Sequence, residues 1–232
     1  MRDLVLHLSA QDMLDLLDTG QVGAVVTDPP CLVERSPDAP SVSCRASAIR
    51  WVKPIVRECA RVLRPGGSLV FMGSPETTDA WTACASRYLS RMAELIVLWN
   101  TGKKHTIGFE SLHTSIHWYV KRGARRTFNC TTRSIPSNIL VCRKVSRGHP
   151  GEQPVGLTNF LISLLTYPHD LIVDPFCGSG STLVSAVQCG RGYVGCDLDE
   201  SCVQMTERRL EHAELEESDP VYLWINGRME VV

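Results

Sequence analysis

Asp28, Pro29 and Pro30 follow an apolar run, residues 23–27, that has the composition of a buried strand. Proline fixes its own φ angle, keeps the preceding residue extended and has no N–H group to donate. The segment therefore presents two acceptors, a carboxylate and a backbone carbonyl, in one direction. Such a pair fits the two hydrogens of an NH2 group. Taken alone, the tripeptide is also compatible with an ordinary loop.

The chemistry that such a pair supports is attack by an aromatic amine. The lone pair of that amine is delocalised into its ring, which makes the nitrogen a weak nucleophile. Two acceptors on its hydrogens favour a tetrahedral nitrogen, and the lone pair can then attack a sulfonium methyl group in line. Positioning and electrostatics are sufficient for this step, so no covalent enzyme intermediate is needed.

A second segment, residues 174–182, reads Asp-Pro-Phe-Cys-Gly-Ser-Gly-Ser-Thr and joins a predicted strand to a predicted helix. Its glycines let a nucleotide-like ligand approach the backbone. Asp197 ends the next predicted strand, where a carboxylate can accept both hydroxyls of a ribose. The turn has neither the Gly-x-Gly-x-x-Gly spacing nor a Gly-Lys-Thr phosphate loop, which argues against a dinucleotide or ATP. For the glycines alone, a tight turn without a ligand remains the alternative.

Apolar runs alternate with longer helical patterns, which is typical of a parallel α/β sheet. We expect strands at residues 4–8, 23–27, 68–72, 95–99, 171–174 and 192–196, and shorter strand pieces at 115–120 and 138–142. We expect helices at residues 11–17, 46–63, 155–165, 182–188 and 200–215, and one more before residue 95. Asn226-Gly227 between apolar runs predicts a hairpin over residues 221–232.

The bulk composition is that of an ordinary soluble protein. The chain has 232 residues, of which 44% are apolar, and its formal net charge is −1. This length suits one core with an inserted or appended lobe. No signal-peptide pattern and no apolar run of membrane-spanning length are present, so we expect a cytoplasmic protein. None of the ten cysteines belongs to a Cys-x-x-Cys pair, so we expect mostly small buried side chains and no metal.

Six elements in one order resemble the amino-methyltransferases of DNA, in the circularly permuted β group. Residues 27–31 look like the family's T-D-P-P-Y, and residues 58–67 look like the helix and turn that follow it. Residues 149–157 resemble H-P-x-x-K-P-x-x-L, and residues 174–182 resemble D-P-F-x-G-S-G-T. Residues 192–197 resemble Y-x-G-x-[DE], and residues 208–210 resemble the closing helix.

The resemblance implies a Rossmann-like fold of S-adenosylmethionine-dependent methyltransferases. This is an α/β fold, with a mostly parallel twisted sheet, helices on both faces and an inserted basic region. Residues 1–100 would form the catalytic half, residues 101–148 the target-recognition region and residues 149–232 the cofactor half. Asp28 and Pro29 would hold the target amine within the catalytic segment that ends in Pro30 and Cys31. S-adenosylmethionine would contact Asp12, Gln153, Asp174, Phe176, Cys177, Gly178, Ser179, Gly180 and Asp197.

Residues 101–148 carry ten Lys or Arg and one acid, Glu110, although the whole chain is nearly neutral. Cations at this density can neutralise phosphates and release counterions, so we predict DNA contacts at Lys103, Lys104, Lys121, Arg122, Arg125, Arg126 and Arg133. A solvated charged face is the alternative. The partner would be DNA whose target base is flipped out or single-stranded. The family also suggests a bacterial or phage-type protein and a homodimer.

Two residues depart from the family pattern. Cys31 stands where an aromatic residue usually stacks on the flipped base, so another ring would be needed, and the candidates are Trp51, Trp81 and Trp99. Cys31 could instead signal a different or modified base, whereas a cysteine nucleophile is disfavoured by its surroundings. Gln153 replaces a lysine, which removes a cation near the cofactor and could reduce cofactor affinity.

The leading hypothesis is methylation of adenine at N6, because the catalytic segment begins with Asp28. Relatives that modify the N4 amine of cytosine more often begin with serine. The alternatives are therefore a cytosine-N4 enzyme, a catalytically impaired DNA-binding relative and a methyltransferase of RNA.

Overall fold

The computed structural model describes residues 2–30, 45–73, 75–103, 111–130, 137–145, 149, 151–225 and 228–231. Ten strands of these ranges form one sheet in the order β1-β8-β7-β2-β3-β5-β4-β6-β9-β10. One half is parallel: β1 (Leu4–His7), β8 (Gly192–Asp197), β7 (Leu171–Asp174), β2 (Val22–Thr27) and β3 (Leu63–Gly73).

In the other half, β5 (Ser111–Val120) runs antiparallel to β3 and to β4 (Ser90–Lys103). The sheet continues with β6 (Ile139–Cys142), β9 (Val221–Ile225) and β10 (Arg228–Val231). The expected α/β fold with a mostly parallel sheet is confirmed.

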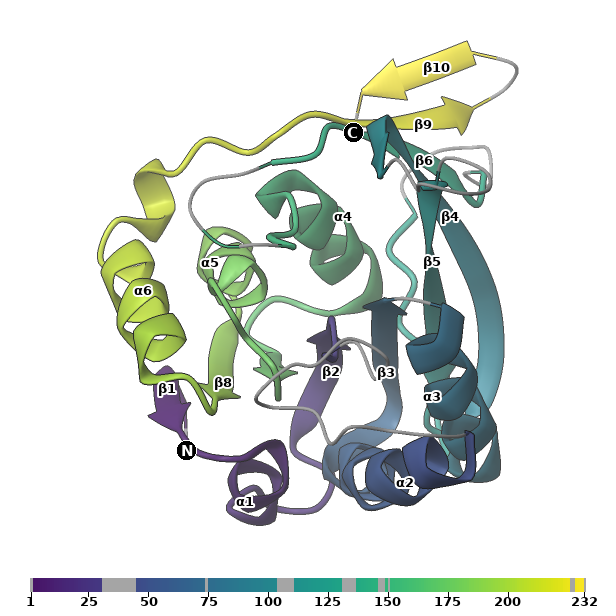
Figure 1. The fold of residues 1–232 in the computed structure, drawn as a ribbon, viewed down its shortest axis with the longest axis vertical. Coiled ribbons are helices and arrows are strands. Elements are labelled where there is room, and N and C mark those ends of the chain that lie inside the picture. The colour runs from purple at the N-terminus through teal and green to yellow at the C-terminus, as the bar shows by residue number, and fades with distance from the viewer. Residues whose placement is uncertain are drawn as a thin grey trace.

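Helices cover both faces of the sheet (Figure 1). One core cluster packs α1 (Ala10–Asp15), α2 (Arg45–Val62) and α3 (Pro75–Tyr88) on one face. The other cluster packs α4 (Val155–Leu165) and part of α5 (Ser181–Gln188) on the opposite face, and α6 (Glu200–Leu210) lies beside α5. Neighbouring residues of β2 divide between the clusters, since Val25 belongs to the first and Val26 to the second. Such burial on both faces explains the unbroken apolar run in the sequence.

Residues 64–67, which separate the predicted helix from the predicted strand at 68–72, lie within a strand in the structure. The structure extends β3 from Leu63 to Gly73 and includes the turn as an irregularity. Its pairing with β2 shifts from Val22–Leu63 to Ala24–Ser68, so β3 has three more residues than β2 between these two pairs. Gly66 has a φ of 79°, which glycine adopts without strain.

The predicted helix over residues 200–215 was too long, because α6 ends at Leu210 and a short 3-10 helix (Ala213–Leu215) follows it. Tertiary bonds account for the early end. Gln188 donates to the carbonyls of Ala213 and Glu216, and Arg209 forms an ion pair with Glu216 at 2.6 Å. These bonds turn the chain back towards α5.

The predicted target-recognition region contributes strands to the central sheet. Both β5 and β6 belong to it, and the predicted boundary at residue 100 falls inside β4. The predicted hairpin at the end of the chain is present as β9 and β10, which project from the far end of the sheet (Figure 1). Its expected turn residues, Asn226 and Gly227, lie outside the described residues.

Candidate active site

The two segments with chemical potential lie at one edge of the sheet. Strand β2 ends just before Asp28, and its parallel neighbour β7 ends at Asp174. The carboxyl ends of adjacent parallel strands share an edge, where ligands of open α/β sheets bind. The two strand ends are also bonded directly, because Thr27 Oγ1 donates to Asp174 Oδ1 at 2.7 Å. The structure thus brings the predicted catalytic and cofactor segments together.

Asp28 is partly exposed, and each of its carboxylate oxygens faces a different neighbour. Gln153 Nε2 donates to Oδ2 at 2.6 Å. On the other side, a Cβ built on Gly73 would lie 3.5 Å from Oδ1, so this oxygen faces a backbone without a side chain. Burial raises the pKa of Asp28 to about 6, and the bond from Gln153 opposes that rise. The carboxylate is therefore largely ionised at slightly alkaline pH and has Oδ1 available as an acceptor.

Asp174 is almost fully buried, and its carboxylate organises the turn that follows β7. Its Oδ1 accepts bonds from Thr27 Oγ1 at 2.7 Å and from the Phe176 amide at 3.1 Å. Burial raises the pKa of Asp174 to about 6, hydrogen bonds from Thr27, Phe176 and Thr182 lower it, and the charge of Asp28 raises it. The two carboxylates are therefore close enough to influence each other's ionisation.

The glycine turn needs residues without side chains. Gly178 has a φ of 50° and Gly180 a φ of 85°, both in the left-handed region that favours glycine. Gly180 begins α5, and a Cβ there would lie 2.6 Å from the Thr206 side chain. Cys177 and Ser179 are buried. Only backbone and the partly exposed Phe176 side chain are thus presented from this turn.

Asp197 closes the turn from the neighbouring strand β8. Its Oδ2 accepts from the Gly178 amide at 2.9 Å, and its Oδ1 accepts from the Asp199 amide at 3.0 Å. A carboxylate offers about four acceptor sites, so this side chain can still accept two hydroxyls. Burial chiefly raises the pKa of the Cys196 thiol well above its usual range, and the charges of Asp174, Asp197 and Asp12 add to that rise. The charges of three predicted cofactor carboxylates thus act on one buried thiol.

Asp12 lies on α1 and is exposed. Its Oδ2 accepts a bond from the Ser9 hydroxyl at 2.6 Å, and the Asp12 amide donates to Ser9 Oγ at 3.2 Å. These bonds form the N-terminal cap of α1, a helix that packs against β8.

The segment before α4 crosses the glycine turn. A Cβ on Gly178 would meet the His149 ring at 3.4 Å, and His149 Nε2 lies 3.5 Å from Cys202 Sγ. Glu152 forms a buried ion pair with Arg209 at 3.2 Å, and Arg209 also donates to the Ser179 carbonyl at 2.7 Å. This segment is thus anchored where it can deliver Gln153 to Asp28. Sequence patterns gave no sign of the Glu152–Arg209 pair, because its members are far apart along the chain.

The three candidate stacking rings occupy different environments. Trp81 is completely buried, so it belongs to the core. Trp99 lies on β4 and donates to Thr114 Oγ1 at 2.9 Å. Trp51 is partly exposed, and its ring centroid is 5.9 Å from that of Phe176. Trp51 is therefore the candidate next to the cofactor turn, whereas Cys31 lies outside the described residues.

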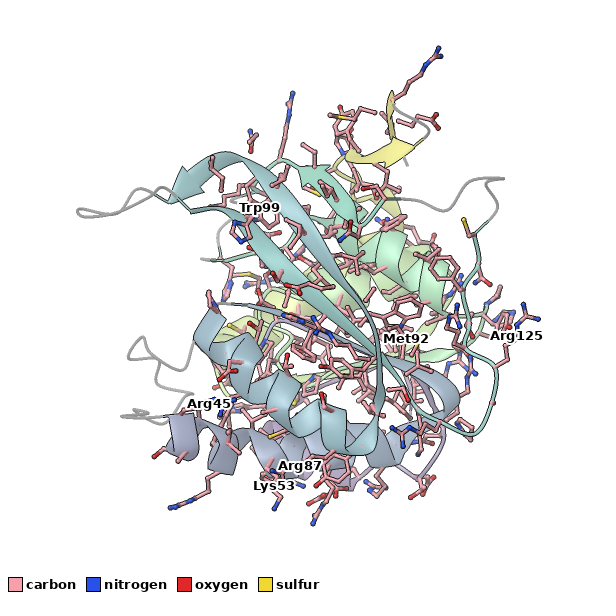
Figure 2. The ribbon with its side chains drawn as sticks, turned by 90° about the vertical axis from the view of Figure 1, so that its right-hand side faces the viewer. Arg45, Lys53, Arg87, Met92, Trp99 and Arg125 are labelled. Atoms are coloured by element: carbon pink, nitrogen blue, oxygen red, sulfur yellow. The ribbon has the colours of Figure 1, made fainter. Side chains whose placement is uncertain are left out.

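The predicted basic region divides between opposite edges of the sheet. The register of β2 and β3 places Asp28 level with Met72. The Lys121 amide instead donates to the carbonyl of Gly67, which is five residues before Met72 on β3. At about 3.3 Å per residue, Gly67 and Met72 are roughly 17 Å apart along the strand. Lys121 Nζ donates to the carbonyls of Arg61 and Leu63 at 3.0 and 2.7 Å, so this cation supports the end of α2. Figure 2 shows Trp99 and Arg125 towards opposite ends of the long β4–β5 pair.

The exposed cations can be assigned to these edges. Arg122, Arg125 and Arg126 are exposed and lie with Lys121 at the edge opposite Asp28. Arg143 and Lys144 are exposed and directly follow β6, whose carboxyl end lies at the same edge as Asp28. Lys103 is the last residue of β4 at that edge. Lys104 and Arg133 lie outside the described residues.

Six of the eight described cysteines are buried, as expected for small core side chains. Within the described ranges, no cluster of three or more His, Cys, Asp or Glu is arranged to hold a metal ion. None of the described helices combines the length and apolarity that a membrane crossing requires.

Comparisons with known proteins agree with this geometry. The N6/N4 DNA methylase family model matches residues 22–208. YubD of Escherichia coli (strain K12), which is named as a methylase, is 29% identical over 191 residues and covers 82% of each chain. The DNA adenine methyltransferase YhdJ of the same organism is 22% identical over 246 residues, covering 90% of this chain and 83% of its own.

Solved structures share the fold. The cytosine-N4-specific PvuII DNA methyltransferase superposes with a TM-score of 0.77 at 18% identity and covers 94% of both chains. The complex of M1.HpyAVI with S-adenosylmethionine gives a TM-score of 0.69 at 20% identity, covering 89% of this chain and 98% of its own. Because the family model spans most of the chain, this protein belongs to the N6/N4 family of DNA methylases.

Proposed function

We propose that this protein transfers a methyl group from S-adenosylmethionine to the exocyclic N6 amine of adenine in DNA. The observation that carries the proposal is the junction of Asp28 and Asp174 at neighbouring strand ends, joined by the 2.7 Å bond from Thr27. An amine acceptor and a nucleotide-binding turn share one edge there. The family supplies the class of reaction, and the choice of base is our proposal.

Asp28 and the carbonyl of Pro29 hold the target amine in this mechanism. Gln153 already occupies Asp28 Oδ2, and the Pro30 carbonyl accepts from Thr77 Oγ1 at 3.5 Å. We assign the amine to Asp28 Oδ1, to which none of the described side chains donates, and to the Pro29 carbonyl. They bind the two amine hydrogens and direct the nitrogen lone pair towards the methyl donor. Asp28, whose pKa is about 6, can take the proton that the nitrogen loses on methylation.

S-adenosylmethionine supplies an electrophilic methyl group on a sulfonium, and the residues of the edge fit it. The positive φ angles of Gly178 and Gly180 keep the turn free of side chains where the backbone meets the cofactor. Asp197 retains acceptor capacity for the ribose hydroxyls. Phe176 with Trp51 offers an apolar wall, and Asp12 offers a carboxylate on α1, which packs against β8. The predicted cofactor roles thus stand as proposals for these residues.

Two observations favour adenine. The catalytic segment begins with an aspartate, Asp28, and the relative YhdJ, which aligns over 90% of this chain, is named as a DNA adenine methyltransferase. The solved cytosine-N4-specific enzyme is 18% identical to this chain, and similarity at that level supports a shared fold alone. Cytosine N4 is therefore the second candidate.

DNA reaches the site from the edge that carries Asp28. We assign phosphate contacts to Arg143 and Lys144, which are exposed at that edge. Lys103, at the end of β4, stays a DNA contact predicted from the sequence. Arg122, Arg125 and Arg126 at the opposite edge add long-range attraction only. The target base has to leave its stack to reach Asp28. A homodimer and a cytoplasmic, bacterial or phage-type location remain predictions from the sequence.

The test is to incubate unmethylated DNA with the protein and S-adenosylmethionine, digest it to nucleosides and analyse them by mass spectrometry. We expect N6-methyladenine. N4-methylcytosine without methyladenine would transfer the proposal to the second candidate. Binding of DNA and cofactor without any methylated nucleoside would identify a catalytically impaired relative. Parallel reactions with single-stranded DNA and RNA test the remaining alternative.

A further inference from the structure

The two ends of the Gln153 side-chain amide have different surroundings. Its Nε2 donates to Asp28 Oδ2 at 2.6 Å and approaches the Gly151 carbonyl at 3.4 Å. Its Oε1 is buried and has no hydrogen-bond donor among the described residues. A buried acceptor without a partner costs folding free energy, so a residue kept only for stability would be expected to satisfy it. The arrangement suits a side chain whose surroundings are completed by a ligand.

We propose that Gln153 is the positioning residue of the amine-binding carboxylate. By donating to Asp28 Oδ2, its amide holds the carboxylate in one orientation, with Oδ1 on the Gly73 side directed at the target amine. This inference rests on the proposed function and assigns Gln153 a task different from the cofactor contact that the sequence suggested.

The segment that carries Gln153 is held in place independently of Asp28. The buried Glu152–Arg209 ion pair at 3.2 Å fixes the preceding residue, and Pro154 begins α4 directly after it. Gln153 is thus presented from a rigid backbone, which limits the rotamer entropy lost when the bond to Asp28 forms. A pre-positioned donor of this kind can fix the direction of a carboxylate before the substrate binds.

Because the Gln153 amide is neutral, it lowers the pKa of Asp28 less than a charged donor would. The charged and titratable groups described at this edge include Asp174 on β7, Asp197 on β8 and His149 in the segment of Gln153, together with Asp12, Arg143 and Lys144. Burial raises the pKa of Asp28 to about 6, and the hydrogen bond from the Gln153 side-chain amide opposes that rise. A lysine, the residue of the family pattern, would add a full positive charge and lower that pKa further. Gln153 thus orients the carboxylate while letting it titrate close to neutrality.

The test compares Gln153→Met, which keeps the length but not the amide, with Gln153→Lys, which restores the family residue. Gln204→Met is the matched control, because Gln204 is exposed on α6 and its amide approaches Glu200 at 3.4 Å. We expect Gln153→Met to lower kcat roughly tenfold or more, with calorimetric S-adenosylmethionine affinity nearly unchanged. The acidic limb of its kcat profile should move to higher pH, and that of Gln153→Lys to lower pH. Gln204→Met should match the unaltered protein.

Several outcomes would overturn the inference. A loss of kcat in Gln153→Met with an unmoved acidic limb would indicate a merely structural role, and full activity would show that the bond is dispensable. If the unaltered protein transfers no methyl group, the proposed function fails separately. The Asp28 carboxyl is then titrated by NMR in the unaltered protein and in Gln153→Lys. An unchanged Asp28 pKa in that comparison would overturn the positioning role without any need for turnover.

Discussion

Thr27 Oγ1 donates a hydrogen bond to Asp174 Oδ1 at 2.7 Å, and both groups are buried. The bond joins the strand that leads into the amine-binding segment to the strand that leads into the glycine turn. Because Asp174 Oδ1 also accepts from the Phe176 amide, one carboxylate oxygen sets the direction of both segments. In the proposed mechanism, the separation between the target amine and the methyl donor therefore depends on this contact.

Replacing Thr27 with valine should loosen that junction. The β-branched shape is kept, but the buried Asp174 carboxylate loses a donor, which costs about 1–3 kcal/mol. We expect a lower free energy of unfolding in urea and weaker S-adenosylmethionine binding by calorimetry. Thr27→Ser keeps the hydroxyl and should behave much like the unaltered protein. Equal stability of the valine and serine variants would contradict the role given to the bond.

The parallel half of the sheet was predictable from the sequence because its physics is local. Unbroken apolar runs indicated strands buried on both faces, and Asp28, Asp174 and Asp197 each lie at or directly after a strand end. Carboxyl ends of parallel strands meet at one edge, so the catalytic and cofactor segments were expected to meet once the strands were neighbours. The sequence did not reveal the order of the strands, which depends on long-range pairing.

Gly180→Ala should destabilise the glycine turn. Its φ of 85° is strained for alanine, and the new Cβ would lie 2.6 Å from the Thr206 side chain. We expect a loss of about 2 kcal/mol in unfolding free energy and weaker S-adenosylmethionine binding. Gly190→Ala is the matched control, because its φ is 70° but no heavy atom lies within 4 Å of the added Cβ. Equal losses in both variants would show that contact with Thr206 is unimportant.

The basic stretch shows what composition cannot resolve. Its ten cations are close in sequence, but β5 carries the chain across the sheet, so Arg125 and Lys144 lie at opposite edges. Charge counting treats them alike. Lys121 is also committed to the carbonyls of Arg61 and Leu63, a role that depends on the tertiary position of α2.

Charge reversal at the two edges should affect DNA binding differently. The Arg143→Glu/Lys144→Glu variant should weaken binding to a short duplex and reduce the slope of log affinity against log salt by about 2, the value for two lost phosphate contacts. The Arg125→Glu/Arg126→Glu variant should change that slope little, because its cations lie away from Asp28. Fluorescence anisotropy over a range of salt concentrations measures both. A larger change in the second variant would place the DNA on the opposite edge.

The burial of the Asp28 carboxylate should lower the free energy of unfolding at neutral pH. Its pKa in the folded protein, about 6, is above the ordinary 3.8, so its contribution to stability is lost as the pH rises through about 6. Asp28→Asn should therefore be more stable than the unaltered protein at pH 7.5, by about 1–3 kcal/mol, and the difference should become small near pH 4 and vanish below it. Urea unfolding at both pH values measures this. A less stable variant at pH 7.5 would contradict the cause assigned to the pKa.

The central claim is that the Asp28 carboxylate holds the target amine beside a separately bound methyl donor. Single-turnover methyl transfer by Asp28→Asn, measured together with calorimetric binding of S-adenosylmethionine, tests it directly. We expect transfer to fall by roughly a hundredfold or more while cofactor affinity stays close to that of the unaltered protein. Undiminished transfer by Asp28→Asn would remove the carboxylate from the reaction and contradict the account.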